Sequence, residues 1–270
     1  MWESNVIVAF FLTILAGLST GIGSALSFFT KRTNTGLLSF SLGFSAGVMI
    51  YVSFVELFFK ARETLITEMG KTEGNFAVAA AFFSGIFFIG IIDRMVPSFE
   101  NPHEIRLVED MSIKAKDKRD EKLLRMGVLS ALAIGIHNFP EGIATFVAGL
   151  SDITLGISIA IAVAIHNIPE GIAVSIPIFY ATGNKKRAFW FSFMSGLAEP
   201  FGALIGLVIL MRFFNNLVFG LLFSFIAGIM VFVALDELLP SAHEFGEHHL
   251  CIYGLVLGMA VMAISLCMLT

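Results

Sequence analysis

Long apolar stretches separated by short polar connections dominate this chain. A helix needs about 20 apolar residues to cross the hydrocarbon core of a bilayer, and eight stretches reach that length. Most connections are short, so we expect consecutive helices to run antiparallel. The pattern predicts an all-α polytopic membrane protein with eight transmembrane helices, at 5–29, 36–59, 75–96, 126–149, 153–181, 187–211, 216–240 and 250–269.

The composition supports a bilayer as the natural solvent. Hydrophobic residues make up 57% of the chain and charged residues 14%, with a mean hydropathy of +0.87, whereas soluble domains carry about 25% charged residues. Phenylalanine, which has no polar group to satisfy in lipid, occurs 29 times. The basic residues are scattered among apolar spans, which excludes nucleic acid as a partner and leaves the lipid bilayer.

One connection is long and polar, and it helps to orient the chain. Residues 97–125 are rich in charged side chains and read as a solvated loop within a single transmembrane domain, 1–270. If the N-terminus lies outside, 13 of the 17 lysines and arginines fall in inner connections. Because basic residues favour cytoplasmic loops, we expect a multi-pass protein of the cell (inner) membrane with both termini outside the cytoplasm.

Two neighbouring spans carry copies of one polar motif. The sequence Gly-Ile-His-Asn-Phe-Pro-Glu-Gly-Ile-Ala begins at Gly135 and recurs from Ala164 with only two positions changed. Helical residues four apart share a face, so each histidine points the same way as the glutamate that follows it, with an asparagine one position around. The motif side chains are His137, Asn138 and Glu141 in the first copy, and His166, Asn167 and Glu170 in the second.

A third span contributes a carboxylate at the same depth. Prolines in both motifs remove a backbone N–H and can free a carbonyl group toward a cavity. Glu199 precedes Pro200 in the middle of the sixth span, so a third broken helix is expected there. One ionised acid at the helix centre costs about 2.5–3.5 kcal/mol, and three would cost about 8–10 kcal/mol. A bound cation would offset that cost.

The residue types indicate which cation. Imidazole, carboxylate and amide groups together suit first-row divalent ions, Zn²⁺ above all, with Fe²⁺, Mn²⁺, Co²⁺ and Cd²⁺ as competitors. Cages for Ca²⁺ or Mg²⁺ would not need histidine. Seven side chains leave room for two adjacent positions bridged by Glu141 and Glu170. The ions are expected as transported substrates, and no cofactor is predicted.

Two classes of function are compatible with such a site. One is a transporter that moves divalent metal ions into the cytoplasm, with access alternating about a midplane site. The other is an intramembrane metalloenzyme, either a zinc hydrolase or a di-iron protein. The His-Glu-x-x-His signature of zinc hydrolases is absent. The pattern therefore favours a transporter that is not an enzyme.

These motifs resemble the ZIP family of metal-ion transporters, and its bacterial zinc-uptake branch in particular. The resemblance rests on the two HNxPEG motifs, the GLAEP segment at 196–200, VALDELLP at 233–240 and GLLSFSLGFSAGVM at 36–49. It implies eight helices with the N-terminus outside, an inverted repeat of spans one to three and six to eight around spans four and five, a homodimer and a binuclear site. The first metal position would use His137, Glu141, His166 and Glu170; the second would use Asn138, Glu141, Asn167, Glu170 and Glu199, and Met49 would line the site.

Several polar residues outside the centre are candidates for ion entry, ion exit or ion sensing. Glu56 could collect ions at an entrance or simply lie at the membrane interface. Asp236 and Glu237 could guide ions out, and His243, His248 and His249 after them could sense ions or belong to a solvated loop. The sequence leaves open the order of metal selectivity, the energy coupling, and the choice between carrier and channel.

Overall fold

A computed structural model describes residues 2–28, 35–95, 116–210, 215–244 and 248–269. These residues form helices and no strand. The helices are α1 (Trp2–Ser27), α2 (Thr35–Tyr51), η1 (Val52–Phe58), α3 (Phe59–Met69), α4 (Lys71–Met95), α5 (Lys116–Ser151), α6 (Ile153–Thr182), α7 (Lys185–Gly196), α8 (Ala198–Ile205), η4 (Gly206–Leu210), α10 (Asn216–Val233), η5 (Ala234–Leu238), α11 (Leu239–Glu244) and α12 (His248–Leu269). The three η segments are π-helical turns.

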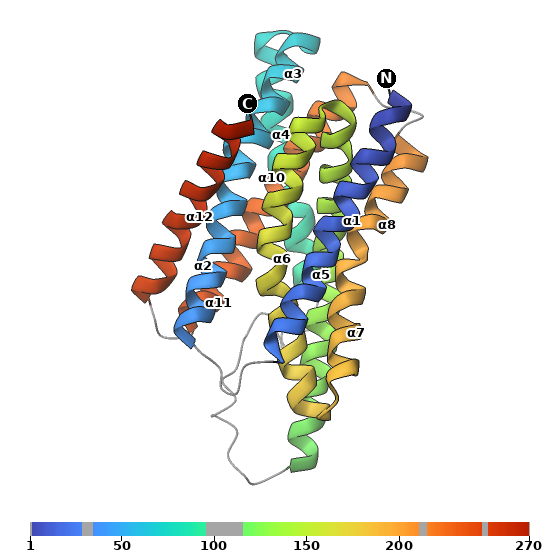
Figure 1. Cartoon of the computed structure of the whole chain (residues 1–270). Helices are drawn as coiled ribbons and strands as arrows, with labels where there is room; N and C mark the ends of the chain where they lie inside the picture. The colour runs from blue at the N-terminus through green and yellow to red at the C-terminus, as the bar shows by residue number, and fades with distance from the viewer. Residues whose placement is uncertain (1, 29–34, 96–115, 211–214, 245–247, 270) are drawn as a thin grey trace.

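The eight predicted spans are confirmed as an up-and-down bundle (Figure 1). Seven described segments are long and apolar enough to cross a membrane, and α5, which carries the first polar motif, is the eighth. Both termini lie at the same end of the bundle (Figure 1). Two boundaries differ from prediction. The second span continues through η1 and α3 to Met69, and α5 begins at Lys116, within the predicted loop; the rest of that loop, 96–115, lies outside the described residues.

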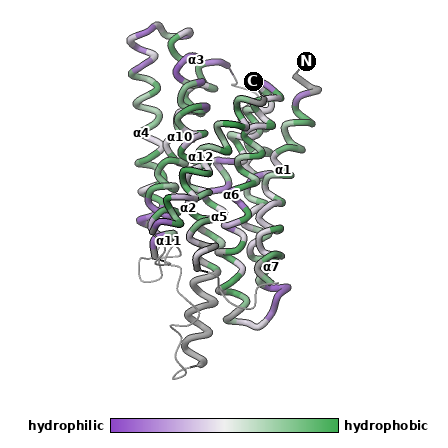
Figure 2. Tube along the Cα trace, turned by 60° about the vertical axis from the view of Figure 1, so that its left-hand side comes forward, coloured by the Kyte–Doolittle hydropathy of each residue, from purple (hydrophilic) through white to green (hydrophobic). Residues whose placement is uncertain are grey.

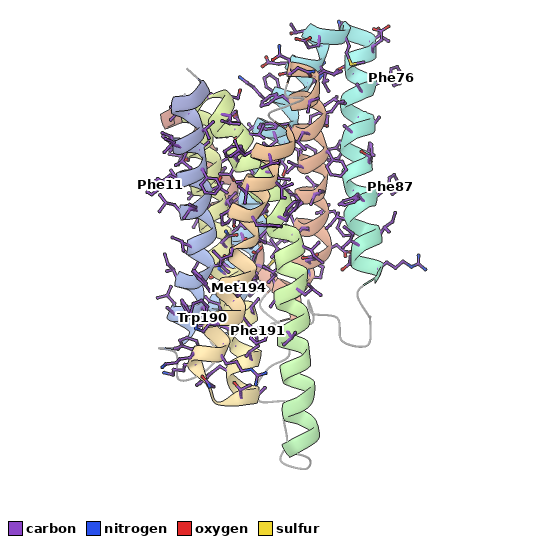
Figure 3. All side chains as sticks on the ribbon, turned by 90° about the vertical axis from the view of Figure 1, so that its right-hand side faces the viewer. Phe11, Phe76, Phe87, Trp190, Phe191 and Met194 are labelled. Carbon is purple, nitrogen blue, oxygen red and sulfur yellow. The ribbon has the colours of Figure 1, made fainter. Side chains whose placement is uncertain are left out.

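Large apolar side chains cover the outside of the bundle. Phe76 is 75% exposed and Phe87 67% exposed, and Figure 3 shows both pointing away from α4, as Phe11 does from α1. Hydrophilic residues gather at the ends, around α3 and the start of α7, with hydrophobic residues along most of the length between them (Figure 2). Such exposure would be costly in water and is expected against lipid.

Helix pairing follows the inverted repeat that the resemblance implies. α1 packs along α6 as α8 packs along α5, and α2 packs along α12 as α10 packs along α4. Matched glycines bring these backbones close. A Cβ built on each would lie about 2 Å from a carbonyl oxygen of the facing helix: Gly142 meets Glu199 (2.0 Å), Gly171 Thr20 (2.0 Å), Gly202 Phe139 (2.2 Å) and Gly23 Ile168 (1.9 Å).

The tight connection between α5 and α6 is held by a capping carboxylate. Asp152 is extended (φ −151°, ψ 128°), and its Oδ1 accepts hydrogen bonds from the backbone N–H groups of Thr154 (2.7 Å) and Leu155 (3.1 Å). We expect Asp152→Ala to lower the free energy of unfolding by about 1 kcal/mol, because two N–H groups lose their acceptor. Thermal unfolding in detergent measures this. Asp152→Asn is the control, since asparagine caps as well as aspartate, and an equal loss in both variants would contradict the capping role.

Candidate metal centre

Two histidines and two glutamates from α5 and α6 meet inside the bundle. His137 Nε2 lies 3.2 Å from Glu141 Oε1 and 3.6 Å from Glu170 Oε1. His166 Nε2 lies 3.0 Å from Glu141 Oε2. Each of the four side chains is at most 4% exposed. The two motif copies therefore form one cluster, as their equal depth predicts, with Glu141 between the two rings.

The spacing of these atoms suits a tetrahedral metal ion. Ligand atoms at about 2.0–2.1 Å from zinc stand about 3.3 Å from one another in a tetrahedron, close to the nitrogen–oxygen separations in the cluster. One ligand atom from each of His137, His166 and Glu170 also falls within 4.8 Å of the others. The side chains can thus converge on one ion with small adjustments.

A backbone contact sets the orientation of His166. Its Nδ1 lies 3.1 Å from the carbonyl oxygen of Ala162, one turn earlier in α6. A carbonyl oxygen can only accept, so Nδ1 carries the proton and Nε2 presents its lone pair in the neutral ring. Contacts of this kind fix the tautomer of metal-binding histidines.

The two asparagines hold the cluster to the flanking helices. Asn138 Nδ2 donates to the carbonyl oxygen of Ser195 in α7 (3.3 Å), and Asn167 Nδ2 donates to that of Ala16 in α1 (3.0 Å). Asn167 Nδ2 also donates to Oε1 of Glu199. The structure therefore brings Glu199 to the second motif, in agreement with its predicted depth.

The sixth span is broken as predicted. α7 ends at Gly196 and α8 begins at Ala198, which places Glu199 in the first turn of α8. Pro200 is tolerated there because the backbone N–H groups of the first turn have no carbonyl acceptor within the helix, so the N–H that proline lacks is not missed. By contrast, Pro140 does not end α5, and α6 runs on through Pro169.

Five buried oxygens in this cluster have no hydrogen-bond partner. They are Asn138 Oδ1, Glu141 Oε1, Asn167 Oδ1, Glu170 Oε2 and Glu199 Oε2. Buried oxygens without a donor are costly, and membrane interiors offer no water to solvate them. All five are atoms that divalent cations accept as ligands. Their convergence with two imidazoles is the arrangement that a bound cation would satisfy.

Among the remaining predicted residues, Glu237 lies close enough to His137 and Glu170 to interact with them electrostatically. Met49 is fully buried in α2, which packs against α6, and its place at the site stays a prediction. Glu56 lies in η1 and Glu237 in η5, both half-buried. His243 is exposed in α11. The side chain of His248 is outside the described part of the chain, and His249 stacks on Tyr253.

Sequence analysis missed the acceptors that position the asparagines. The carbonyl groups of Ala16 and Ser195 have no side-chain signature. A weak signal exists in the segments that follow them, because GLSTGIG at 17–23 and GLAEPFG at 196–202 both have glycine at the first and seventh positions.

The fold defines a polytopic helical membrane protein, and its buried His/Glu cluster is compatible with a metal site. Comparison with known proteins agrees. Residues 100–266 match the family model described as ZIP Zinc transporter. The chain is 58% identical to the zinc transporter ZupT of Oceanobacillus iheyensis (98% of this chain, 99% of that protein) and 58% identical to ZupT of Lysinibacillus sphaericus (99% of each). It is 59% identical to ZupT of Nitratidesulfovibrio vulgaris (98% of each).

The chain belongs to the ZIP family of zinc transporters. The assignment to the ZIP family that the sequence motifs indicated is confirmed. Because the family consists of transporters, the alternative of a metalloenzyme is rejected.

Proposed function

We propose that this protein takes up Zn²⁺ into the cytoplasm through the buried centre between α5 and α6. The observation that carries the proposal is the convergence of two imidazoles with partnerless carboxylate and amide oxygens. The names of the relatives, all zinc transporters, support zinc as the substrate. Fe²⁺, Mn²⁺, Co²⁺ and Cd²⁺ can use the same ligand types and are proposed as competitors.

We assign the ligands to two adjacent positions within one transport domain. His137, Glu141, His166 and Glu170 form the first position, and Asn138, Asn167 and Glu199 join the two glutamates at the second, with Met49 beside them. Support comes from the short contacts among the first group and from the Asn167–Glu199 bond in the second. Mixed ligands of this kind favour the moderate affinity that release requires.

Zinc flux into sealed proteoliposomes tests the proposal. Wild-type protein should accumulate radiolabelled zinc above empty vesicles, and Glu170→Gln should reduce the initial rate at least about tenfold, because losing one charged ligand costs about 1.4 kcal/mol or more in zinc binding. Ser158→Ala is the control in the same helix: Ser158 is buried, and its hydroxyl donates only to the carbonyl of Thr154 (3.0 Å). Uptake equal to that of empty vesicles would overturn the transporter assignment.

Orientation and assembly complete the proposal. We place both termini outside the cytoplasm, and the distribution of basic residues supports this orientation. Protease should remove an N-terminal tag from intact spheroplasts, and a protected tag would reverse the assignment.

The exposed aromatic side chains of α4 supply an apolar face for lipid or for a second copy of the chain. Crosslinking in native membranes should yield a homodimer, and a monomer alone would contradict it.

A further inference from the structure

Two seven-residue segments that each begin and end with glycine flank the candidate metal centre. GLSTGIG occupies residues 17–23 of α1, and GLAEPFG occupies residues 196–202 across α7 and α8. Aligned on their glycines, the segments place Thr20 opposite Glu199. The first segment therefore carries a neutral hydroxyl where the second carries a carboxylate.

The packing of the helices confirms this equivalence. The glycine after each motif glutamate meets the backbone of one of these two residues: a Cβ on Gly142 would lie 2.0 Å from the carbonyl oxygen of Glu199, and one on Gly171 would lie 2.0 Å from that of Thr20. Thr20 thus stands against the second motif's helix as Glu199 stands against the first motif's helix. The inverted repeat relates the two residues directly.

The hydroxyl of Thr20 is buried and has no hydrogen-bond partner. Its side chain is fully buried, and Oγ1 makes no hydrogen bond. A threonine in a helix usually bonds to the carbonyl one turn earlier, as Thr13 does with Ala9 (2.9 Å) in the same helix. The orientation of the Thr20 side chain leaves its hydroxyl available for another partner.

That partner is indicated by the position of Gly196. A Cβ built on Gly196 would lie 2.8 Å from Thr20 Oγ1, so the hydroxyl lies against this residue. The preceding residue, Ser195, supplies the carbonyl that Asn138 Nδ2 reaches at 3.3 Å. Thr20 and Asn138 therefore approach consecutive residues of α7, Gly196 and Ser195.

The other half of the repeat shows the completed arrangement. Asn167 Nδ2 donates one hydrogen to the carbonyl of Ala16 and the other to the carboxylate of Glu199. Asn138 Nδ2 makes the first of these two bonds, to Ser195, and no bond of the second kind. The equivalent acceptor on its side is the hydroxyl of Thr20.

We propose that Thr20 is a positioning residue for the ion site: when the ion binds, Thr20 Oγ1, which makes no hydrogen bond in the structure, accepts the second N–H of Asn138 and so holds Asn138 Oδ1 toward the ion. The inference rests on the proposed transport function. It also makes the two sides of the site unequal, because Glu199 adds a negative charge beside Asn167 and Thr20 adds none beside Asn138. The ion is therefore held more strongly on the Glu199 side.

Zinc flux and zinc binding by the purified full-length protein test the role of Thr20. Thr20→Val keeps the shape of the side chain and removes the acceptor, so the KM for zinc and its dissociation constant should rise about three- to tenfold, the effect of one hydrogen bond. Thr20→Ser keeps the hydroxyl, so its KM and dissociation constant for zinc should equal those of the wild type. Thr13→Val is the matched control in α1, and it should leave both values unchanged, because that hydroxyl serves only its own helix.

A double-mutant cycle separates positioning from packing. Once Asn138→Ala has removed the amide, Thr20→Val should have little further effect on zinc binding, since the two changes break one interaction. Wild-type binding and flux in Thr20→Val, or additive effects in the double variant, would overturn the inference while leaving the transport function intact. Absence of zinc uptake by the wild type would instead overturn the proposed function.

Discussion

Replacing Glu141 with glutamine should reduce zinc transport about a hundredfold or more. Glu141 contacts both histidines, His137 through Oε1 and His166 through Oε2. The amide keeps the volume but loses the charge and one acceptor oxygen, so both rings lose their anionic partner and a bridging ligand disappears. A hundredfold change in zinc affinity corresponds to about 2.7 kcal/mol, which is modest for a buried charged group.

The measurement is initial zinc flux together with zinc affinity of the purified protein. Glu141→Asp is the informative companion, because it retains the charge but shortens the reach, and it should retain more affinity than the glutamine variant. Thermal unfolding without metal checks that the protein folds. A Glu141→Gln protein that folds and transports at the wild-type rate would exclude Glu141 as a ligand.

A single methyl group on Gly142 should destabilise the bundle and stop transport. A Cβ at this position would lie 2.0 Å from the carbonyl oxygen of Glu199 and 2.5 Å from its Cα. These are backbone atoms, so α5 and α8 must move apart to admit Gly142→Ala. Overpacking of this kind costs about 1–3 kcal/mol, occasionally more, and the movement would also draw Glu199 away from the site.

Gly135→Ala is the matched control in α5. A Cβ there would have as its nearest neighbour the Cα of Ser195, at 3.8 Å, which is ordinary contact. Alanine is a better helix former than glycine by about 1 kcal/mol, so this variant should be at least as stable as the wild type. Equal thermal stability of the two variants in detergent would mean that the close approach at Gly142 does not hold the helices in register.

The central motifs show how far sequence reasoning reaches. The helical repeat of 3.6 residues places His137 and Glu141 on one face without knowledge of the fold, and the apolar lengths define the spans. The break before Glu199 was expected from Pro200 and is present, but α5 and α6 continue through Pro140 and Pro169, so proline alone does not decide where a helix ends. The loop boundary was less accurate, because the charged residues from Lys116 onward are compatible with either a solvated loop or a helix end.

Other features depend on contacts between distant segments. No local pattern shows that Asn138 will bond to the carbonyl of Ser195, or that Asn167 will bond to the carbonyl of Ala16. Backbone carbonyls occur at every residue, and only helix packing selects one of them as an acceptor. The role inferred for Thr20 also depends on the tertiary structure. The likeness between segments 17–23 and 196–202 indicates a shared role only because Thr20 in α1 and Glu199 in α8 make equivalent contacts with Gly171 and Gly142.

The sequence by itself determined that the protein lies in a membrane, where its spans are and which polar side chains lie at its centre, because these depend on composition and on periodicity within single helices. The tertiary structure decided which carboxylate lies between the two histidines, which carbonyls hold the asparagines and how closely the helices approach. Those features depend on the register between helices, which is set by side-chain packing and by glycines such as Gly142 and Gly171 that admit a facing backbone.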